Sequence, residues 1–181
     1  MMPADLQIRA LDRAEYAGKP FVVRYATRGY YDVTADEDGF HLTFRAFDAP
    51  VEKGFEDRLF GDWLEDPVAY GAFDGERLVG FIEGSPESWN RRYRISNLCV
   101  PEEADRGKGV GRALMDVLLA EAKRSGTRMA VLETQSCNVP AIAFYRKCGF
   151  RCIGLDLYAY TNRDPERGEV RLEMGLALRD E

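Results

Sequence analysis

The stretch DRGKGVGRALMDVLLAEAKRSG, residues 105–126, joins a glycine-rich turn to an amphipathic segment. Its apolar residues recur at helical spacing, and Gly126 follows two basic residues where a helix would end. The spacing therefore predicts a helix over residues 109–125 that begins directly at the turn.

The turn before this helix has the features of an anion-binding site. The first N–H groups of a helix lack intrahelical partners and carry the positive end of its dipole. Glycines let an anion approach them closely, and neighbouring basic side chains add charge, so we expect the turn to bind a phosphate or pyrophosphate. The candidate residues are Arg106, Gly107, Lys108, Gly109, Val110, Gly111 and Arg112. A purely structural turn is the alternative.

Two familiar glycine loops fit this turn poorly. The dinucleotide fingerprint G-x-G-x-x-G requires a last glycine where this chain has Arg112 or Leu114. A P-loop requires G-x-x-x-x-G-K followed by Ser or Thr, which is absent from the sequence. Both motifs are therefore weak alternatives for this turn.

Segments on both sides of the helix predict strands and one further helix. Hairpin turns are expected at Asp38-Gly39 and Asp74-Gly75, a helical turn after Asp12, and an irregular, acidic segment from Asp48 to Asp66. The expected strands and hairpins cover 6–11, 21–26, 30–47, 68–85, 92–100, 128–135, 150–160 and 169–178, with the second helix over 139–148. The pattern predicts an α/β (α+β) fold in a single domain, 1–181, whose mixed central sheet of about six to seven strands is flanked by helices.

Composition narrows the classes of function. The chain has 181 residues, of which 45% are hydrophobic and 31% charged, as in an ordinary globular protein. It lacks a long apolar run and a signal-peptide pattern, so we expect a cytoplasmic protein that binds no membrane. A net charge of -6 argues against nucleic-acid binding. One histidine and no C-x-x-C pair leave no ligand set for a metal, so none is expected.

Negative charge is concentrated in one part of the chain. From Asp32 to Asp66 there are eleven acidic residues against three basic ones, a local net charge of -8 that exceeds the total. Either this is a solvated acidic surface, or it attracts a cationic substrate.

With its surroundings, the turn resembles that of a known enzyme family. Residues 106–111, RGKGVG, match the pattern Q/R-x-x-G-x-G/A, and they lie between a strand ending NLCV and the later segment NVPAIAFYRKCGF. In this order the segments resemble the GCN5-related N-acetyltransferases (GNAT). The segments VTADEDGFHL, SWNRR, RGKGVGRALM, LETQSCNVPAIAFYRKCGF and GLDLYAYTN narrow the resemblance to the streptothricin (nourseothricin) acetyltransferases.

The resemblance implies a fold, a reaction and partners. It implies the GNAT fold, acetyl-CoA as acyl donor with its pyrophosphate in the turn, and transfer of the acetyl group to the β-lysine amino group of a streptothricin-type antibiotic. The partner is then a small cationic amine, in agreement with the acidic segment, and a homodimer is one alternative for the assembly. The rival functions are acetylation of proteins or polyamines, a non-catalytic acyl-CoA sensor, and a structural protein using the acidic face.

Acetyl transfer to an amine needs a neutral nitrogen, a stabilised oxyanion and a proton for the leaving thiolate. Glu133 and Glu83 are the candidate carboxylates, Glu133 as a base and Glu83 in substrate binding, each with a structural role as its alternative. By resemblance, the main chain of 98–100 (Leu98, Cys99 and Val100) pairs with the pantetheine arm, and an N–H of this strand meets the oxyanion. Relatives carry acidic residues along this strand, where this chain has Ser96, Asn97 and Cys99.

The remaining candidates lie outside that strand or have a second interpretation. Tyr145 matches the family's tyrosine, which contacts the cofactor and protonates the thiolate; packing is its alternative. Asn138 is expected to cap the second helix and, by resemblance, to contact the cofactor. Trp89 is a candidate for stacking on a cationic substrate. The alternative is that it belongs to a solvated strand edge with no role in binding. Cys99 as a nucleophile is the less favoured alternative, because the family transfers the acetyl group directly.

Overall fold

A computed structural model of the chain describes residues 6–179. Within that range the strands are β1 (Leu6–Ala10), β2 (Pro20–Asp36), β3 (Gly39–Arg58), β4 (Val68–Asp74), β5 (Arg77–Glu87), β6 (Arg92–Cys99), β7 (Met129–Gln135), β8 (Arg151–Asp156) and β9 (Arg171–Ala177). The helices are α1 (Arg13–Tyr16), α2 (Val110–Arg124), α3 (Val139–Lys147) and α4 (Asp164–Arg167), with a 3-10 turn at Glu103–Asp105.

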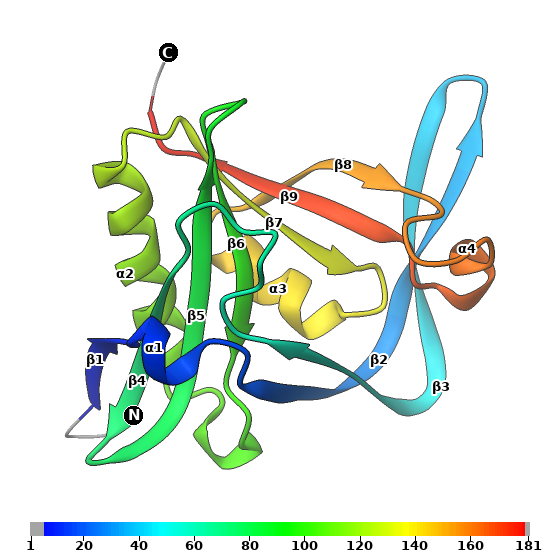
Figure 1. Ribbon diagram of the computed structural model, residues 1–181. Coiled ribbons are helices and arrows are strands. Elements are labelled where there is room, and N and C mark those ends of the chain that lie inside the picture. Colours follow the sequence, from blue (N-terminus) through cyan, green and yellow to red (C-terminus); the bar gives the residue numbers. More distant parts are fainter. Residues whose placement is uncertain (1–5, 180–181) are drawn as a thin grey trace. The chain divides into compact units, whose positions relative to one another are not determined.

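Seven strands form one sheet in the order β1-β4-β5-β6-β7-β9-β8, and β2 and β3 form a separate two-stranded ribbon (Figure 1). The prediction of a mixed sheet of six to seven strands flanked by helices is thereby confirmed. The described residues group into two compact units. The first comprises 6–23, 55–131 and 177–179, and the second comprises 24–54 and 132–176.

The first unit is an antiparallel meander covered by α2. Strands β1, β4, β5 and β6 pair with their neighbours in antiparallel register, for example Phe81 with Cys99. Leu114, Met115 and Leu118 of α2 are fully buried, and the helix packs on β4, β5 and β6. Burying three large apolar side chains stabilises the unit by about 1.5–3 kcal/mol each. The helix predicted over residues 109–125 therefore forms, and its apolar face is the one that is buried.

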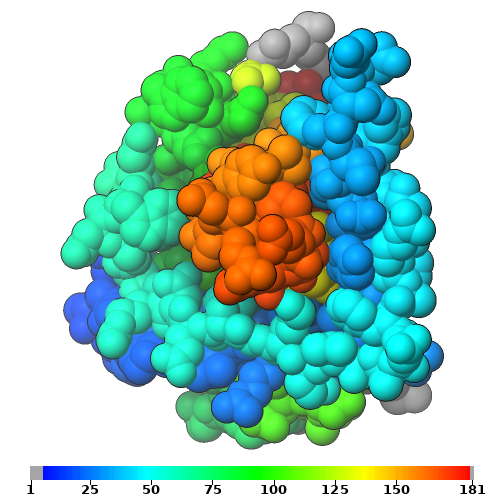
Figure 2. Space-filling view, turned by 90° about the vertical axis from the view of Figure 1, so that its right-hand side faces the viewer, coloured from blue at the N-terminus to red at the C-terminus, as the bar shows by residue number. Residues whose placement is uncertain are grey.

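The second unit contains the ribbon, α3, β8, α4 and most of β9. Its buried side chains include Val33 from the ribbon, Ile142 from α3 and Met174 from β9. Figure 2 shows α4 and the chain before it in orange, beside the ribbon in blue and cyan. The two approach closely, because a Cβ added at Gly168 would lie 2.5 Å from the ring of Tyr30. At this position φ is also +64°, so glycine is required for two reasons.

Both predicted hairpins form, with turns one residue from the expected positions. Asp74 pairs with Arg77, so the second turn is Gly75 and Glu76, and Gly75 takes the positive φ of 62°. In the ribbon the strands end at Asp36 and resume at Gly39. The Asp36 carboxylate accepts the N–H groups of residues 38 and 39 at 2.9 and 3.1 Å, which places the turn before the aspartate-glycine pair.

Two expectations about irregular and extended segments were wrong. The acidic segment 48–66 is a strand as far as Arg58, and only Leu59–Asp66 is irregular. Pairing along the ribbon keeps these polar residues extended. The strand expected over 150–160 ends at Asp156, and α4 precedes β9. Asp164 accepts the N–H groups of residues 160 and 161 at 2.8 and 2.9 Å, which bends the chain there.

Candidate functional site

The predicted site residues fall into two groups, one in each unit. The first unit holds Glu83, Trp89, Leu98, Cys99, Val100 and all of Arg106–Arg112. The second holds Glu133, Asn138 and Tyr145.

The glycine turn delivers the open end of α2. Gly107 and Gly109 have φ of 72° and 89°, and Gly109 is the N-cap, so it leaves the helix end without a capping side chain. The first helical hydrogen bond runs from Ala113 N–H to the Gly109 carbonyl at 3.0 Å, and the N–H groups before it belong to the uncapped end. A Cβ at Gly107 would meet nothing within 4 Å. The turn therefore fits an approaching anion such as a pyrophosphate.

The basic residues around this turn are held in place by specific partners. Arg106 donates from Nε to the Val100 carbonyl and from Nη2 to the Pro101 carbonyl, both at 2.9 Å, which braces the turn against the end of β6. Lys108 Nζ lies 3.6 Å from a carboxylate oxygen of Asp105. Arg112 Nε donates to Asp116 one helical turn later, at 2.9 Å. The positive charge predicted at the turn is present and ordered.

Asp105 and Arg77 form an ion pair that sequence reasoning missed. Arg77 donates from Nη1 and Nη2 to the two Asp105 oxygens at 2.7 and 3.2 Å, and the Asp105 side chain is only 5% exposed. The Arg77 hydrogen bonds lower the pKa of Asp105 below its usual value. The pair ties the β4–β5 hairpin to the residue that enters the glycine turn. The only signal in the sequence is one acidic residue directly before a basic turn.

The segment predicted to bind pantetheine, residues 98–100, lies at the C-terminal end of β6. Cys99 is buried, whereas the residues on either side of it are partly exposed. Strand β5 approaches closely here, because a Cβ at Gly80 would lie 2.9 Å from the Cys99 carbonyl and 3.2 Å from Val110. Glycine at this position lets the end of β6, the neighbouring strand and the start of α2 pack together.

The two candidate substrate residues of the first unit differ sharply in exposure. Trp89, in the turn between β5 and β6, is 83% exposed. Glu83 is fully buried, and its carboxylate accepts hydrogen bonds from the Phe60 N–H, the Ser96 hydroxyl and the Asn97 amide. Ser96 and Asn97 of β6 therefore bind a carboxylate that the neighbouring strand β5 supplies.

In the second unit Glu133 pairs with an arginine of β9. Its carboxylate lies 2.6 Å from Arg171 Nη2, and the Glu133 side chain is 40% exposed. Burial raises the pKa of the nearby Tyr160 hydroxyl, and the charge of Glu133 raises it further. Glu133 is thus an accessible carboxylate, paired with Arg171, near the Tyr160 hydroxyl.

Helix α3 carries Asn138 and Tyr145 at defined positions. Asn138 is the N-cap, as predicted, and its side-chain oxygen accepts the Ala141 N–H at 3.3 Å. The Tyr145 ring contacts the rings of Phe144 and Phe150, with centroid distances of 5.7 and 6.2 Å. These aromatic contacts help to hold the ring in place.

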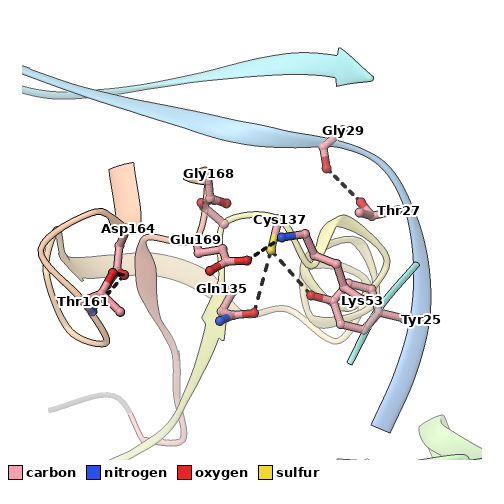
Figure 3. Close-up of polar contacts among 11 residues, drawn as sticks. Tyr25, Thr27, Gly29, Lys53, Gln135, Cys137, Thr161, Asp164, Gly168 and Glu169 are labelled. Carbon is pink, nitrogen blue, oxygen red and sulfur yellow. Dashed lines mark hydrogen bonds and ion pairs between the residues drawn. The ribbon is translucent and has the colours of Figure 1, made fainter. Parts of the chain in front are cut away.

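A partly buried polar cluster lies beside the chain that enters α3 (Figure 3). Cys137 Sγ lies 3.5 Å from the Tyr25 hydroxyl and 3.8 Å from Gln135 Oε1, while Lys53 donates to Glu169 at 2.5 Å. Burial raises the pKa of both the Cys137 thiol and the Tyr25 hydroxyl. These contacts anchor the residue directly before the Asn138 cap.

Residues 6–179 contain no group of three or more histidine, cysteine, aspartate or glutamate side chains that could hold a metal ion. In the same range no helix has the length and apolar character needed to cross a membrane.

Comparison with known proteins places the chain in a family. The model of the "Acetyltransferase (GNAT) family" matches residues 36–150. Streptothricin acetyltransferase of Escherichia coli is 34% identical over 148 residues, 82% of each chain, and that of Streptomyces lavendulae is 35% identical over 162 residues, 84% of each chain. The crystal structure of a nourseothricin acetyltransferase superposes with a TM-score of 0.78 at 33% identity, covering 96% of this chain and 99% of that one. The chain therefore belongs to the GNAT family of acetyltransferases.

Proposed function

We propose that this protein transfers the acetyl group of acetyl-CoA to the β-lysine amino group of streptothricin-type antibiotics. The observation that carries the proposal is the identity of 34–35% to two streptothricin acetyltransferases over more than four fifths of each chain. The uncapped start of α2 adds a physical reason for a phosphorylated acyl donor. The substrate is then a small polycationic amine.

The donor site is assigned to the first unit. The turn from Arg106 to Arg112 holds the pyrophosphate of acetyl-CoA through the first N–H groups of α2 and through its basic side chains. The main chain of 98–100 pairs with the pantetheine arm, and an N–H of this strand donates to the oxyanion. By the family resemblance, Asn138 at the cap of α3 is assigned a further contact with the cofactor.

The transfer is direct and balanced in protons. The neutral amine nitrogen attacks the thioester carbonyl, a C–N bond forms, the C–S bond breaks, and the nitrogen loses one proton while the departing sulfur gains one. Tyr145 donates the proton to sulfur and contacts the cofactor there. A lysine-type amine is neutral in only about one molecule in a thousand near pH 7, so a base is needed. Glu133, an accessible carboxylate, is assigned this role, directly or through water.

Recognition of the amine is assigned to negative charge and an exposed indole. The side chain of Trp89 stands free of the surface and can stack on a cationic group. Acidic residues of the segment 32–66 attract the polycation from solution, an effect that salt weakens.

The test of this function compares different amines as acceptors, with acetyl-CoA as the acyl donor throughout. We expect thiol release from acetyl-CoA with streptothricin to exceed that with lysine, spermidine or a lysine-containing peptide by at least about tenfold in kcat/KM, because only the antibiotic fits the complete amine site. Mass spectrometry of the product checks that one β-lysine nitrogen carries the acetyl group. Preference for the peptide or the polyamine would reject the proposed substrate, and binding of CoA without turnover of any amine would indicate a sensor.

Direct transfer also makes a prediction for Cys99. Burial raises the pKa of its thiol to about 11, so about one thiol in ten thousand is ionised at pH 7. We expect Cys99→Ala to keep turnover within about threefold of the parent protein. Iodoacetamide should modify the exposed Cys152 well before Cys99, as followed by peptide mass spectrometry. Loss of turnover in Cys99→Ala with CoA binding intact would instead support a covalent acetyl-cysteine.

A further inference from the structure

Glu83 is a buried carboxylate that the reaction described above does not use. It lies in β5 with an exposed fraction of 0%. Its Oε1 accepts the Phe60 N–H at 2.5 Å, and its Oε2 accepts the Ser96 hydroxyl and the Asn97 side-chain amide, both at 2.9 Å. Three neutral donors from two other segments therefore converge on one side chain.

A β-bulge between β5 and β6 makes this convergence possible. Glu83 pairs with Asn97, and the next residue, Gly84, pairs with Ile95, so Ser96 is the extra residue of β6. Successive side chains of a regular strand point to opposite faces, whereas a bulge re-aims one of them. Ser96 and Asn97 consequently reach the same carboxylate oxygen, directly before the strand end assigned to the acetyl donor.

The third donor belongs to a strained segment. Phe60 has a φ of 58°, a left-handed conformation that bulky residues adopt only when their surroundings hold them there. Its side chain is 5% exposed and packs in a cluster with Leu11, Leu59 and Phe81, while its N–H is held by Glu83. Both the side chain and the backbone of Phe60 are thus fixed.

Phe60 is the second residue of a loop that carries negative charge and an exposed indole. The loop, Leu59–Asp66, contains three carboxylates and Trp63, which is 66% exposed. Its Glu65 accepts the Ser88 N–H at 3.0 Å and so holds the turn that carries Trp89. The loop and this turn together form an acidic rim with two exposed indoles, which has the chemistry that binds polycations.

We infer that Glu83 is a positioning residue, whose buried carboxylate ties the Leu59–Asp66 loop to β6 and thereby sets the acidic rim relative to the strand that holds the acetyl donor. The inference rests on the proposed acetylation of a cationic amine. A carboxylate suits this task because it accepts from all three donors at once and makes stronger hydrogen bonds than a neutral acceptor.

Two substitutions at this position separate positioning from a direct role in chemistry. Glu83→Gln keeps one acceptor for the Phe60 N–H, and the Ser96 hydroxyl and Asn97 amide can reverse to suit the new NH₂ group, so the loop stays tied although the charge is gone. Glu83→Ala removes every acceptor. A group that binds the amine by charge or removes its proton would fail in both variants.

The experiment combines kinetics with hydrogen–deuterium exchange of the peptide that covers residues 59–66. We expect Glu83→Ala to exchange this peptide at least about tenfold faster and to raise the KM for streptothricin about tenfold, with the KM for acetyl-CoA within about threefold. Glu83→Gln should stay within about threefold of the parent in all three quantities. The matched control is Glu121→Gln on α2, whose carboxylate accepts from Tyr70 and Arg124 and does not touch the loop.

The outcomes are distinct. Equal loss of turnover in Glu83→Gln and Glu83→Ala, with unchanged exchange of 59–66, would overturn positioning in favour of a direct role for the charge. Unchanged exchange and kinetics in Glu83→Ala would also overturn it. If that variant does not fold, Ser96→Ala removes one donor at a partly exposed position and should still accelerate exchange of the loop. The exchange measurement needs no substrate, so inactivity toward streptothricin would reject the proposed substrate without deciding the role of Glu83.

Discussion

Replacing Tyr145 by phenylalanine is expected to lower kcat by about a hundredfold to ten-thousandfold, the range over which positioned general acids contribute. The substitution removes one hydroxyl and leaves the ring, which keeps its contacts with Phe144 and Phe150. Without that hydroxyl the leaving thiolate must take its proton from water, while the contacts of the glycine turn and of residues 98–100 with the acetyl donor are retained. The affinity for CoA should therefore stay close to that of the parent protein.

Steady-state thiol release with streptothricin measures the effect, and isothermal calorimetry with CoA checks binding. The control variant is Tyr70→Phe, which removes the same hydroxyl from a partly buried ring of β4 that donates to Glu121 at 3.1 Å. That change should leave kcat within about twofold. A Tyr145→Phe enzyme with normal kcat would show that the tyrosine is only a packing residue and that the proton comes from elsewhere.

Replacing Gly107 by valine is expected to raise the KM for acetyl-CoA by about ten- to a hundredfold, through strain in the turn and loss of access to the N–H groups of α2. Gly107 has a φ of 72° and open space where a Cβ would stand. A branched side chain would occupy the space through which the pyrophosphate approaches, and it would disfavour the left-handed backbone. The amine KM should change much less.

Gly75→Val is the matched control for this change. Gly75 has a φ of 62° and also nothing within 4 Å of an added Cβ, but it lies in the hairpin turn between β4 and β5. Both variants should lose comparable thermal stability, because they carry the same backbone strain, and only Gly107→Val should weaken CoA binding. Equal acetyl-CoA KM values in the two variants would mean that the turn does not hold the donor.

The elements that carry local signals could be predicted from the sequence. Helix α2 follows from apolar spacing and from Gly126 after two basic residues, and α3 follows from Asn138, whose side chain caps it as expected. The turn between β2 and β3 is displaced by one residue, since Asp36 binds two N–H groups that the aspartate-glycine rule does not consider. The strand over 48–58 was missed because it is rich in charged residues and almost all of its side chains are exposed, so it shows no clear alternation.

The missed parts of the candidate site depend on contacts between distant residues. Arg77 and Asp105 are 28 positions apart, and Phe60 and Glu83 are 23 positions apart, so neither pair leaves a periodic or motif-like trace. The bulge that lets Ser96 and Asn97 reach the same carboxylate depends on strand register. The alternation of side chains does not specify this register to a single residue. The glycine turn, in contrast, is local and could be located from six consecutive residues.

The exposure of Trp63 and Trp89 determines what the intrinsic fluorescence of this protein reports. They are the chain's two tryptophans, and they are 66% and 83% exposed. An indole that already faces water changes its surroundings little when the chain unfolds, so intrinsic emission will be a poor indicator of melting and circular dichroism or calorimetry must follow it. The same indoles lie open to a collisional quencher such as acrylamide. Their fluorescence therefore reports what covers the surface, and a ligand that shields them can be titrated without any label.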